Sequence, residues 1–282
     1  MNITTIVLIP GVWMTALCWQ NWIKHYSDKG YLVVARSWPG MEGSIEQLRR
    51  GPGDLASLGI TKIVDHYEHI IRDLETPPFI IGNGFGGLAT QILLDRGWGA
   101  AGVAIASSPI KGILRCPTIS MVGAILGDAL KDRKVTSLTA AQFHRRYANT
   151  LNESESRAAF ERYAVPGPTR MLLQTAFPNF VPQAATSVNF RNNTRAPLLL
   201  VAAGKDLITP PSLVKANFDL YRQSKAETDY KEFPDKSHFI IGEKDWEKVA
   251  DYVLGWALCC ANGSKLTAVP NHTDTWSVQF ST

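Results

Sequence analysis

The segment Ile80-Ile-Gly-Asn-Gly-Phe-Gly-Gly-Leu88 decides the fold class of this 282-residue chain. Two β-branched apolar residues lead into a glycine-rich turn, and a helical pattern follows it. Strand, tight turn and helix in this order are typical of a nucleophile elbow, G-x-S-x-G, in which a serine is exposed on a strained turn. Here the five positions read Gly82-Asn83-Gly84-Phe85-Gly86, so a glycine stands where the motif has its serine.

Gly84 has no side chain, and no acyl-enzyme can therefore form at this position. The sequence predicts that ordinary serine hydrolysis through residue 84 does not take place.

Short apolar runs rich in β-forming residues alternate with amphipathic helical patterns, which indicates parallel βαβ units. Several runs are almost continuously apolar, as strands covered on both faces are. The predicted strands are Thr5–Ile9, Tyr31–Ala35, Phe79–Gly82, Gly102–Ala106, Leu198–Ala202 and Asp229–Phe233. The predicted helices are Cys18–Lys29, Ile63–Leu74, Phe85–Asp95, Pro211–Ser224 and Asp245–Leu258.

The interval 109–190 interrupts this alternation. It contains helical patterns rich in aromatic residues and no run that predicts a strand. We therefore expect a core built from residues 1–108 and 191–261, with 109–190 inserted as a helical cap. From residue 262 the pattern dissolves into Gly, Ser, Thr, Pro and Asn, which predicts a flexible tail over 262–282.

Composition excludes several functional classes. The net charge of +4 is too small and too dispersed to indicate nucleic-acid binding, and no apolar run has membrane-spanning length. The N-terminus reads as a strand rather than a signal peptide, and the four cysteines have neither zinc-finger nor paired-disulfide spacing. These features favour a cytoplasmic protein that acts on a small molecule without a metal or cofactor. The oligomeric state is left open, a homodimer included.

Two downstream segments carry candidate catalytic side chains. Leu198–Asp206 is an apolar strand that ends in a glycine turn and an aspartate, and Glu232–Phe239 is a strand followed by a loop with His238. The chain order of elbow, Asp206 and His238 is that of the α/β-hydrolase fold. Near the N-terminus, Ile6–Trp13 supplies a strand and turn where that fold has its oxyanion loop.

From residue 1 to about 258 the chain resembles the α/β-hydrolase superfamily, and it looks most like the small esterase and hydroxynitrile-lyase-like branch. The resemblance implies a mostly parallel sheet of about six strands flanked by helices. It also implies that Asp206 is the acid, His238 the base, and the backbone N–H groups of Val12 and Phe85 the oxyanion-hole donors.

Two departures from this branch matter. Its members usually have His-Gly where this chain has Pro10-Gly11, a mild change because the N–H donor comes from the residue after the glycine. They usually have Gly-His-Ser where this chain has Gly82-Asn83-Gly84, and this change removes the nucleophile. Because Asn83 departs from this pattern as well as Gly84, a natural change is favoured over an engineered removal of the serine.

Each candidate also has a purely structural interpretation. Asp206 can serve as the cap of the helix that begins near Thr209, His238 as a buried hydrogen-bonded histidine, and Gly84 as a drifted position in an inactive protein. Because Asp206 and His238 both stand at the positions of the acid and the base in this superfamily, the catalytic interpretation is favoured over the structural one. The candidate substrate-binding residues are Trp13, Asn83, His144, Tyr147 and Phe177. For His144, packing in the core is the competing interpretation.

Three functional hypotheses follow. An oriented histidine, two backbone donors and an enclosed apolar pocket can remove a proton, stabilise an enolate or alkoxide, and return the proton. The leading hypothesis is a cofactor-independent, non-hydrolytic lyase, cyclase, isomerase or carbon–carbon bond-forming enzyme acting on a small apolar carbonyl compound, as in natural-product biosynthesis. The second is a hydrolase in which His238 activates water against a reactive ester, lactone or epoxide. The third is a non-catalytic ligand-binding protein, against which the presence of Asp206 and His238 argues.

Overall fold

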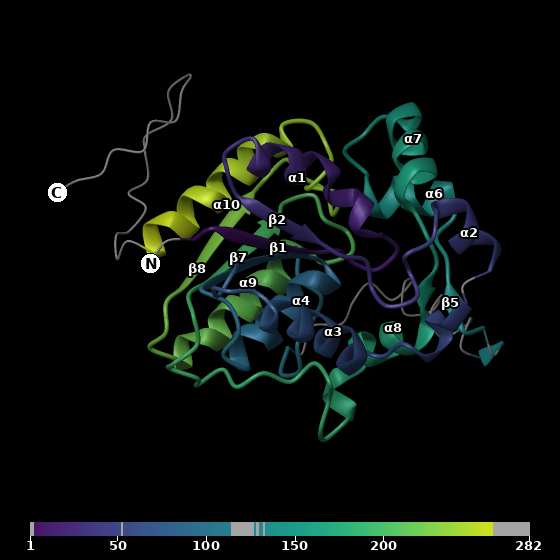
Figure 1. Ribbon diagram of the computed structural model, residues 1–282. Helices are drawn as coiled ribbons and strands as arrows, with labels where there is room; N and C mark the ends of the chain where they lie inside the picture. Colours follow the sequence, from purple (N-terminus) through teal and green to yellow (C-terminus); the bar gives the residue numbers. More distant parts are fainter. Residues whose placement is uncertain (1–2, 52, 114–126, 128–129, 132, 262–282) are drawn as a thin grey trace.

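The computed structural model describes residues 3–51, 53–113, 127, 130–131 and 133–261 (Figure 1). The predicted tail and part of the predicted cap lie outside the described residues, so both stay predictions. Within the described ranges, none of the helices combines the length and the apolar character needed to cross a membrane.

A six-stranded, fully parallel sheet forms the centre of the molecule, with the order β2-β1-β3-β4-β7-β8 (Figure 1). Every residue of the four inner strands is buried, whereas the edge strands β2 and β8 are partly exposed. The continuous apolar runs therefore reflect coverage of both faces, as predicted. The strands are β1 (Thr5–Ile9), β2 (Leu32–Ala35), β3 (Phe79–Asn83), β4 (Ala101–Ile105), β7 (Leu198–Ala203) and β8 (Thr228–Phe233).

Helices cover the two faces of the sheet (Figure 1). On one face α1 (Gln20–Ser27) contacts α10 (Trp246–Ala261), and on the other α3 (Ile60–Arg72) contacts α4 (Phe85–Asp95), with α9 (Pro211–Leu220) beside the sheet. This arrangement confirms the predicted fold class.

Two helical features were not predicted from the sequence. The short helix α2 (Ile45–Arg50) was missed, and α3 begins at Ile60, before the predicted start at Ile63. The side-chain oxygen of Gln174 accepts a hydrogen bond from the Ile60 N–H at 3.0 Å, which satisfies a donor that has no intrahelical partner. Because this contact spans more than a hundred residues, local sequence patterns do not reveal it.

The described residues between β4 and β7 add no strand to the main sheet. We keep the name cap segment for the predicted interval 109–190. Figure 1 shows α6, α7 and β5 together at one end of the sheet. The expectation that this interval lacks strands is wrong, because β5 and β6 form an antiparallel pair. Each strand has only two residues, too few to give a periodic signal. The described elements are β5 (Val135–Thr136), α6 (Ala140–Gln142), the π-helical turn η3 (Phe143–Tyr147), α7 (Glu153–Tyr163), β6 (Gly167–Pro168), α8 (Thr169–Ala176) and η4 (Pro178–Phe180).

Candidate active site

Gly84 lies at the tight turn between β3 and α4. Its backbone has φ 56° and ψ −115°, a conformation that strains any residue with a Cβ atom. Its N–H donates to the Ile105 carbonyl at 2.8 Å, and its carbonyl accepts from the Ser108 N–H at 2.9 Å. These bonds to the end of β4 and the loop after it fix the position of residue 84.

The glycine at position 82 is required by close packing. A Cβ atom there would lie 2.0 Å from the carbonyl oxygen of Gly86, a distance that real Cβ atoms do not adopt. The end of β3 and the first turn of α4 therefore approach each other more closely than side chains permit. The strand–turn–helix predicted for this segment is confirmed.

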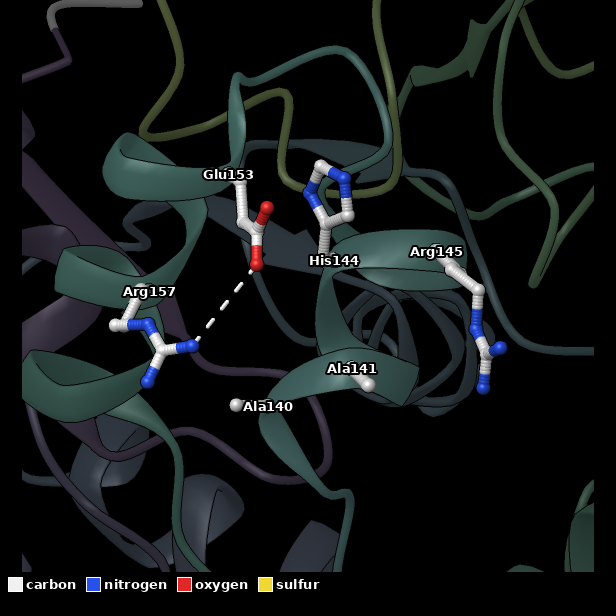
Figure 2. Close-up of a pocket in the computed structure, with 6 residues that line it drawn as sticks. All are labelled: Ala140, Ala141, His144, Arg145, Glu153 and Arg157. Carbon is white, nitrogen blue, oxygen red and sulfur yellow. Dashed lines mark ion pairs between the residues drawn. The ribbon is translucent and has the colours of Figure 1, made fainter.

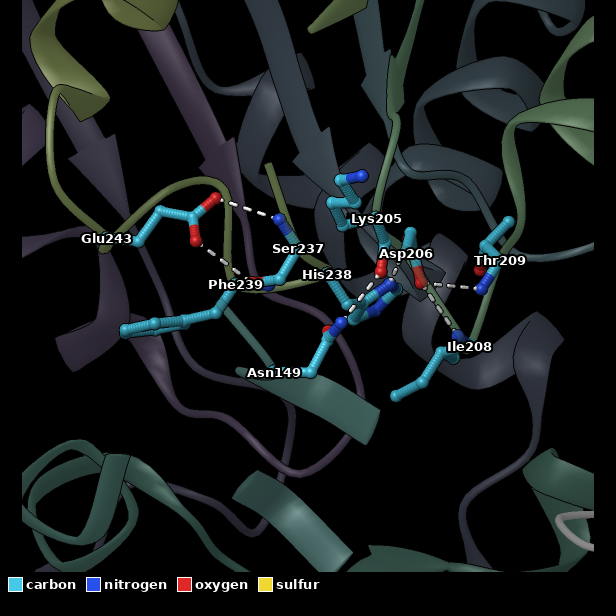
Figure 3. A network of polar contacts seen from close by, with 9 residues as sticks. All are labelled: Asn149, Lys205, Asp206, Ile208, Thr209, Ser237, His238, Phe239 and Glu243. Carbon is cyan, nitrogen blue, oxygen red and sulfur yellow. Dashed lines mark hydrogen bonds and ion pairs between the residues drawn. The ribbon is translucent and has the colours of Figure 1, made fainter. Parts of the chain in front are cut away.

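Asp206 and His238 follow neighbouring strands, β7 and β8, and their side chains meet (Figure 3). Asp206 Oδ2 lies 2.7 Å from His238 Nδ1, and both side chains are buried. Asp206 Oδ1 also accepts from the N–H groups of Ile208 and Thr209, at 2.7 and 2.8 Å. The aspartate therefore both caps the following turn and binds the imidazole. A neutral imidazole that donates from Nδ1 has a free lone pair at Nε2.

Nε2 of His238 faces the elbow. A Cβ atom built on Gly84 would lie 3.1 Å from Nε2, 3.5 Å from Cε1 and 3.8 Å from Gly11 Cα. Among the described residues, no hydrogen-bond partner of Nε2 is found. The basic nitrogen thus points at residue 84, where this chain provides no hydroxyl group.

The hydroxyl groups of Ser237 and Ser107, which lie in loops after the strands, form hydrogen bonds with residues other than His238. Ser237 donates to Glu243 Oε2 at 3.0 Å. Ser107 accepts from Gln91 Nε2 at 2.8 Å and donates to the Ser108 carbonyl at 3.1 Å. Neither hydroxyl is bonded to His238.

The loop after β1 packs against the elbow. A Cβ atom on Gly86 would lie 2.1 Å from the Ile9 carbonyl oxygen, and one on Gly11 would lie 3.0 Å from the Asn83 carbonyl oxygen. This close approach places Val12, which follows Gly11, near Phe85, the first residue of α4. The Phe85 N–H has no acceptor within its helix. No backbone acceptor for either N–H is found in the described part of the chain. The oxyanion hole formed by Val12 and Phe85 remains a proposal.

Three buried polar groups without partners among the described residues surround the elbow: the Tyr147 hydroxyl, the Asn83 amide and the Trp38 indole N–H. The Tyr147 ring meets the His238 imidazole edge-on, with centroids 4.8 Å apart. Trp38, which sequence reasoning missed, packs edge-on against Phe85 at 5.0 Å. Burial raises the pKa of Tyr147 well above its usual value, so its phenol stays protonated and can donate a hydrogen bond.

Two other predicted pocket residues have described contacts with groups outside the dyad. Trp13 is buried and donates from Nε1 to the Thr136 carbonyl in β5 at 3.0 Å, which joins the loop after β1 to the cap segment. Phe177 packs against Phe180, with centroids 6.2 Å apart.

His144 lines a separate cavity of about 250 Å³ between α6, η3 and α7 (Figure 2). No described contact joins His144 or Phe177 to His238, so their assignment to the substrate pocket stays a prediction. The cavity is lined by Ala140, Ala141, His144, Arg145, Glu153 and Arg157. Within the described ranges, His, Cys, Asp and Glu side chains form no group of three that could hold a metal ion.

The sequence profile of the Alpha/beta hydrolase family matches residues 6–252, and the chain belongs to this family. No curated protein matches the chain at a significant level.

Solved structures with the same fold include several enzymes. A monoacylglycerol lipase from Paleococcus ferrophilus is 19% identical, with a TM-score of 0.64 over 91% of this chain and 94% of that one. A methylesterase from Arabidopsis is 13% identical, with a TM-score of 0.61 over 89% and 98%. A pyrethroid hydrolase from Sphingobium faniae is 14% identical, with a TM-score of 0.59 over 93% and 100%. At these identities the similarity shows the fold alone.

Proposed function

We propose that this protein is a cofactor-independent proton-transfer enzyme that acts on a small carbonyl compound, as a lyase, cyclase, isomerase or carbon–carbon bond-forming catalyst. The observation that carries the proposal is a complete histidine–aspartate pair aimed at a glycine. Asp206 holds Nδ1 of His238 at 2.7 Å, whereas Nε2 faces Gly84, where the nucleophile of a serine hydrolase would stand.

The residues around this pair suit removal of a proton next to a carbonyl group. His238 Nε2 takes the proton, so the C–H bond breaks, an N–H bond forms, and the electron pair moves into an enolate. The N–H groups of Val12 and Phe85 donate to the enolate oxygen, and the Asp206 carboxylate stabilises the imidazolium. In an isomerisation, His238 returns the proton to a different carbon. In a ring closure, the enolate carbon forms a bond to a second carbonyl carbon of the same substrate, and the oxygen of that carbonyl takes the electron pair and then the proton from His238; a cleavage is the reverse of this step.

The surroundings favour an apolar substrate with few polar contacts. The aromatic rings of Phe143, Tyr147 and Phe239 pack together beside His238, and Trp38 packs on Phe85. These rings exclude water from the base, which lowers the local dielectric and strengthens the hydrogen bonds to the enolate.

A second function is favoured by the comparisons, because the similar solved structures bear the names of a lipase, a methylesterase and a pyrethroid hydrolase. In this alternative, Nε2 of His238 removes a proton from water, and the resulting hydroxide attacks a reactive ester, lactone or epoxide. The oxyanion donors and the orienting role of Asp206 are unchanged. No acyl-enzyme forms in either function.

Hydrogen–deuterium exchange tests the proton-transfer function without knowledge of the natural substrate. Small ketones and aldehydes are incubated with the protein in D₂O, and the loss of signals from protons next to the carbonyl is followed by ¹H NMR. We expect His238→Ala to lower the exchange rate by about 10²–10⁴-fold. His25→Ala is the matched control, because His25 forms its own pair with Asp251, at 2.8 Å, away from the elbow.

Hydrolysis of activated esters in H₂¹⁸O separates the two functions. One outcome would replace the first function by the second: His238→Ala leaves hydrogen exchange unchanged on every carbonyl compound tested but abolishes ester hydrolysis. If His238→Ala keeps both reactions at the wild-type rate, both proposed functions are wrong.

A further inference from the structure

The cap segment is hydrogen-bonded to both loops that carry the catalytic pair. The Tyr147 carbonyl accepts from the Phe239 N–H at 2.9 Å. Asn149 Nδ2 donates to the Lys205 carbonyl at 3.0 Å, as Figure 3 shows. The Thr150 hydroxyl donates to Glu243. We call Tyr147, Asn149 and Thr150 the cap clamp.

The first two of these bonds reach a residue directly next to the pair in the sequence, and the third reaches such a residue through Glu243. Phe239 follows His238, and Lys205 precedes Asp206. Glu243 in turn accepts from both the N–H and the hydroxyl of Ser237, the residue before His238, at 2.9 and 3.0 Å. His238 is therefore held from both sides along the chain, and Asp206 from one side.

Glu243 is an unusual residue in this network. Its side chain is buried, and its carboxylate forms no ion pair within the described residues. Three hydrogen bonds, two from Ser237 and one from Thr150, satisfy it instead. A carboxylate needs several donors when it is buried, so the cap and the histidine loop share a group that neither satisfies alone.

We propose that Asn149, Thr150 and Glu243 are positioning residues that set the alignment of His238 on Asp206, so that the seating of the cap determines whether the base is in place. The Asp206–His238 hydrogen bond joins loops from two different strands, and such a bond weakens steeply when its angle changes. The cap clamp joins the same two loops a second time. The chemical use of the base, for proton transfer to carbon or from water, is immaterial to this role.

The test uses the full-length protein and the downfield ¹H NMR resonance of the His238 Nδ1–H, assigned by its absence in His238→Ala. Thr150→Val removes the hydroxyl and keeps the shape of the side chain, whereas Thr150→Ser keeps the hydroxyl. Asn149→Ala removes the donor to Lys205. Asn152→Ala is the matched control, because Asn152 caps α7 in the same cap segment and bonds to neither loop.

We expect Thr150→Val and Asn149→Ala to shift or broaden the resonance and to lower the His238-dependent rate by about 10- to 100-fold, the effect of a small misplacement of a reacting group. Thr150→Ser and Asn152→Ala should leave the resonance as in the wild type.

Thermal unfolding measured on the same variants distinguishes alignment from stability. If Thr150→Val and Asn149→Ala lower the melting temperature as Asn152→Ala does and leave the resonance unchanged, the clamp only stabilises the fold and the proposal is wrong. The resonance needs no substrate, so this result is independent of whether the proposed function holds.

Discussion

A Cβ atom on Gly84 would lie 3.1 Å from Nε2 of His238, closer than ordinary van der Waals contact. The imidazole therefore occupies a position that suits glycine at the elbow and would have to shift by a few tenths of an ångström for any larger residue. The turn conformation at residue 84 favours glycine independently, because its φ is positive. The contact with His238 and the backbone conformation of the turn therefore both favour glycine at position 84.

The first prediction concerns this contact. Gly84→Ala and Gly97→Ala both place a Cβ atom at positive φ, which costs about 1–3 kcal/mol of folding free energy. Only Gly84→Ala also presses on His238, because a Cβ atom on Gly97 meets nothing within 4 Å. We expect both variants to be destabilised in urea unfolding, and only Gly84→Ala to lose carbonyl hydrogen exchange. Equal exchange rates in the two variants would show that the contact is unimportant.

Gly84→Ser tests whether the glycine serves the function. We expect the variant to fold, to lose most of its exchange activity, and to gain weak hydrolysis of a small activated ester. The serine hydroxyl competes for Nε2 of His238, and the elbow becomes strained by about 1–3 kcal/mol. Retention of full exchange activity in Gly84→Ser would make the glycine incidental.

Asp206→Asn should lower the His238-dependent rate by about 10²–10⁴-fold, because an amide at this position favours the wrong imidazole tautomer. Asp251→Asn is the control, since Asp251 contacts His25 at 2.8 Å in a pair remote from the elbow. Rates are compared by NMR at matched protein concentration. A rate in Asp206→Asn as high as in Asp251→Asn would remove the aspartate from the mechanism.

A fluorophosphonate probe should not label the protein. Residue 84 has no hydroxyl, and the hydroxyls of Ser107 and Ser237 are bonded to groups other than His238. Intact-mass spectrometry checks this, with an active serine hydrolase in the same tube as the positive control. Stoichiometric modification would reveal a nucleophilic serine that the present assignment overlooks.

Tyr147→Phe should leave the free energy of unfolding unchanged or raise it by about 1–2 kcal/mol, because the deleted hydroxyl is buried without a partner among the described residues. The control is Tyr26→Phe, which deletes a buried hydroxyl that donates to the Ala250 carbonyl at 2.9 Å. That variant should lose about 1 kcal/mol. The free energy of unfolding of both variants is measured by urea unfolding and compared with that of the wild type. A large loss in Tyr147→Phe would mean that the hydroxyl has a bonding partner that supports the fold.

The sheet was predictable because its inner strands are short, continuously apolar runs separated by helical patterns. The elbow was predictable because its glycines stand at fixed spacing, and the structure shows the close approach that requires one at position 82. Asp206 and His238 were paired through the resemblance of their chain order to that of a known fold, and the structure brings them within 2.7 Å.

Other features depend on contacts that no local pattern records. Trp38 lies far from the elbow in the sequence, and only the fold brings its ring onto Phe85. Asn149 and Glu243 look like ordinary polar residues until their partners in distant loops are known. The assignment of His144 to the substrate pocket rested on its aromatic neighbours and stays a prediction; the structure adds that His144 lies on the π-helical turn and lines a cavity there.

The cap clamp also bears on how this protein can diversify. In many enzymes, the segment that covers the substrate varies freely because the catalytic groups sit on a separate scaffold. Here Asn149 and Thr150 lie in the segment that we predict to be the cap, and they reach Lys205 and Glu243. A chimera that receives the cap segment of a relative would therefore lose alignment of the base along with the old specificity. We therefore propose that a change of cap segment alters substrate range and catalytic competence at the same time.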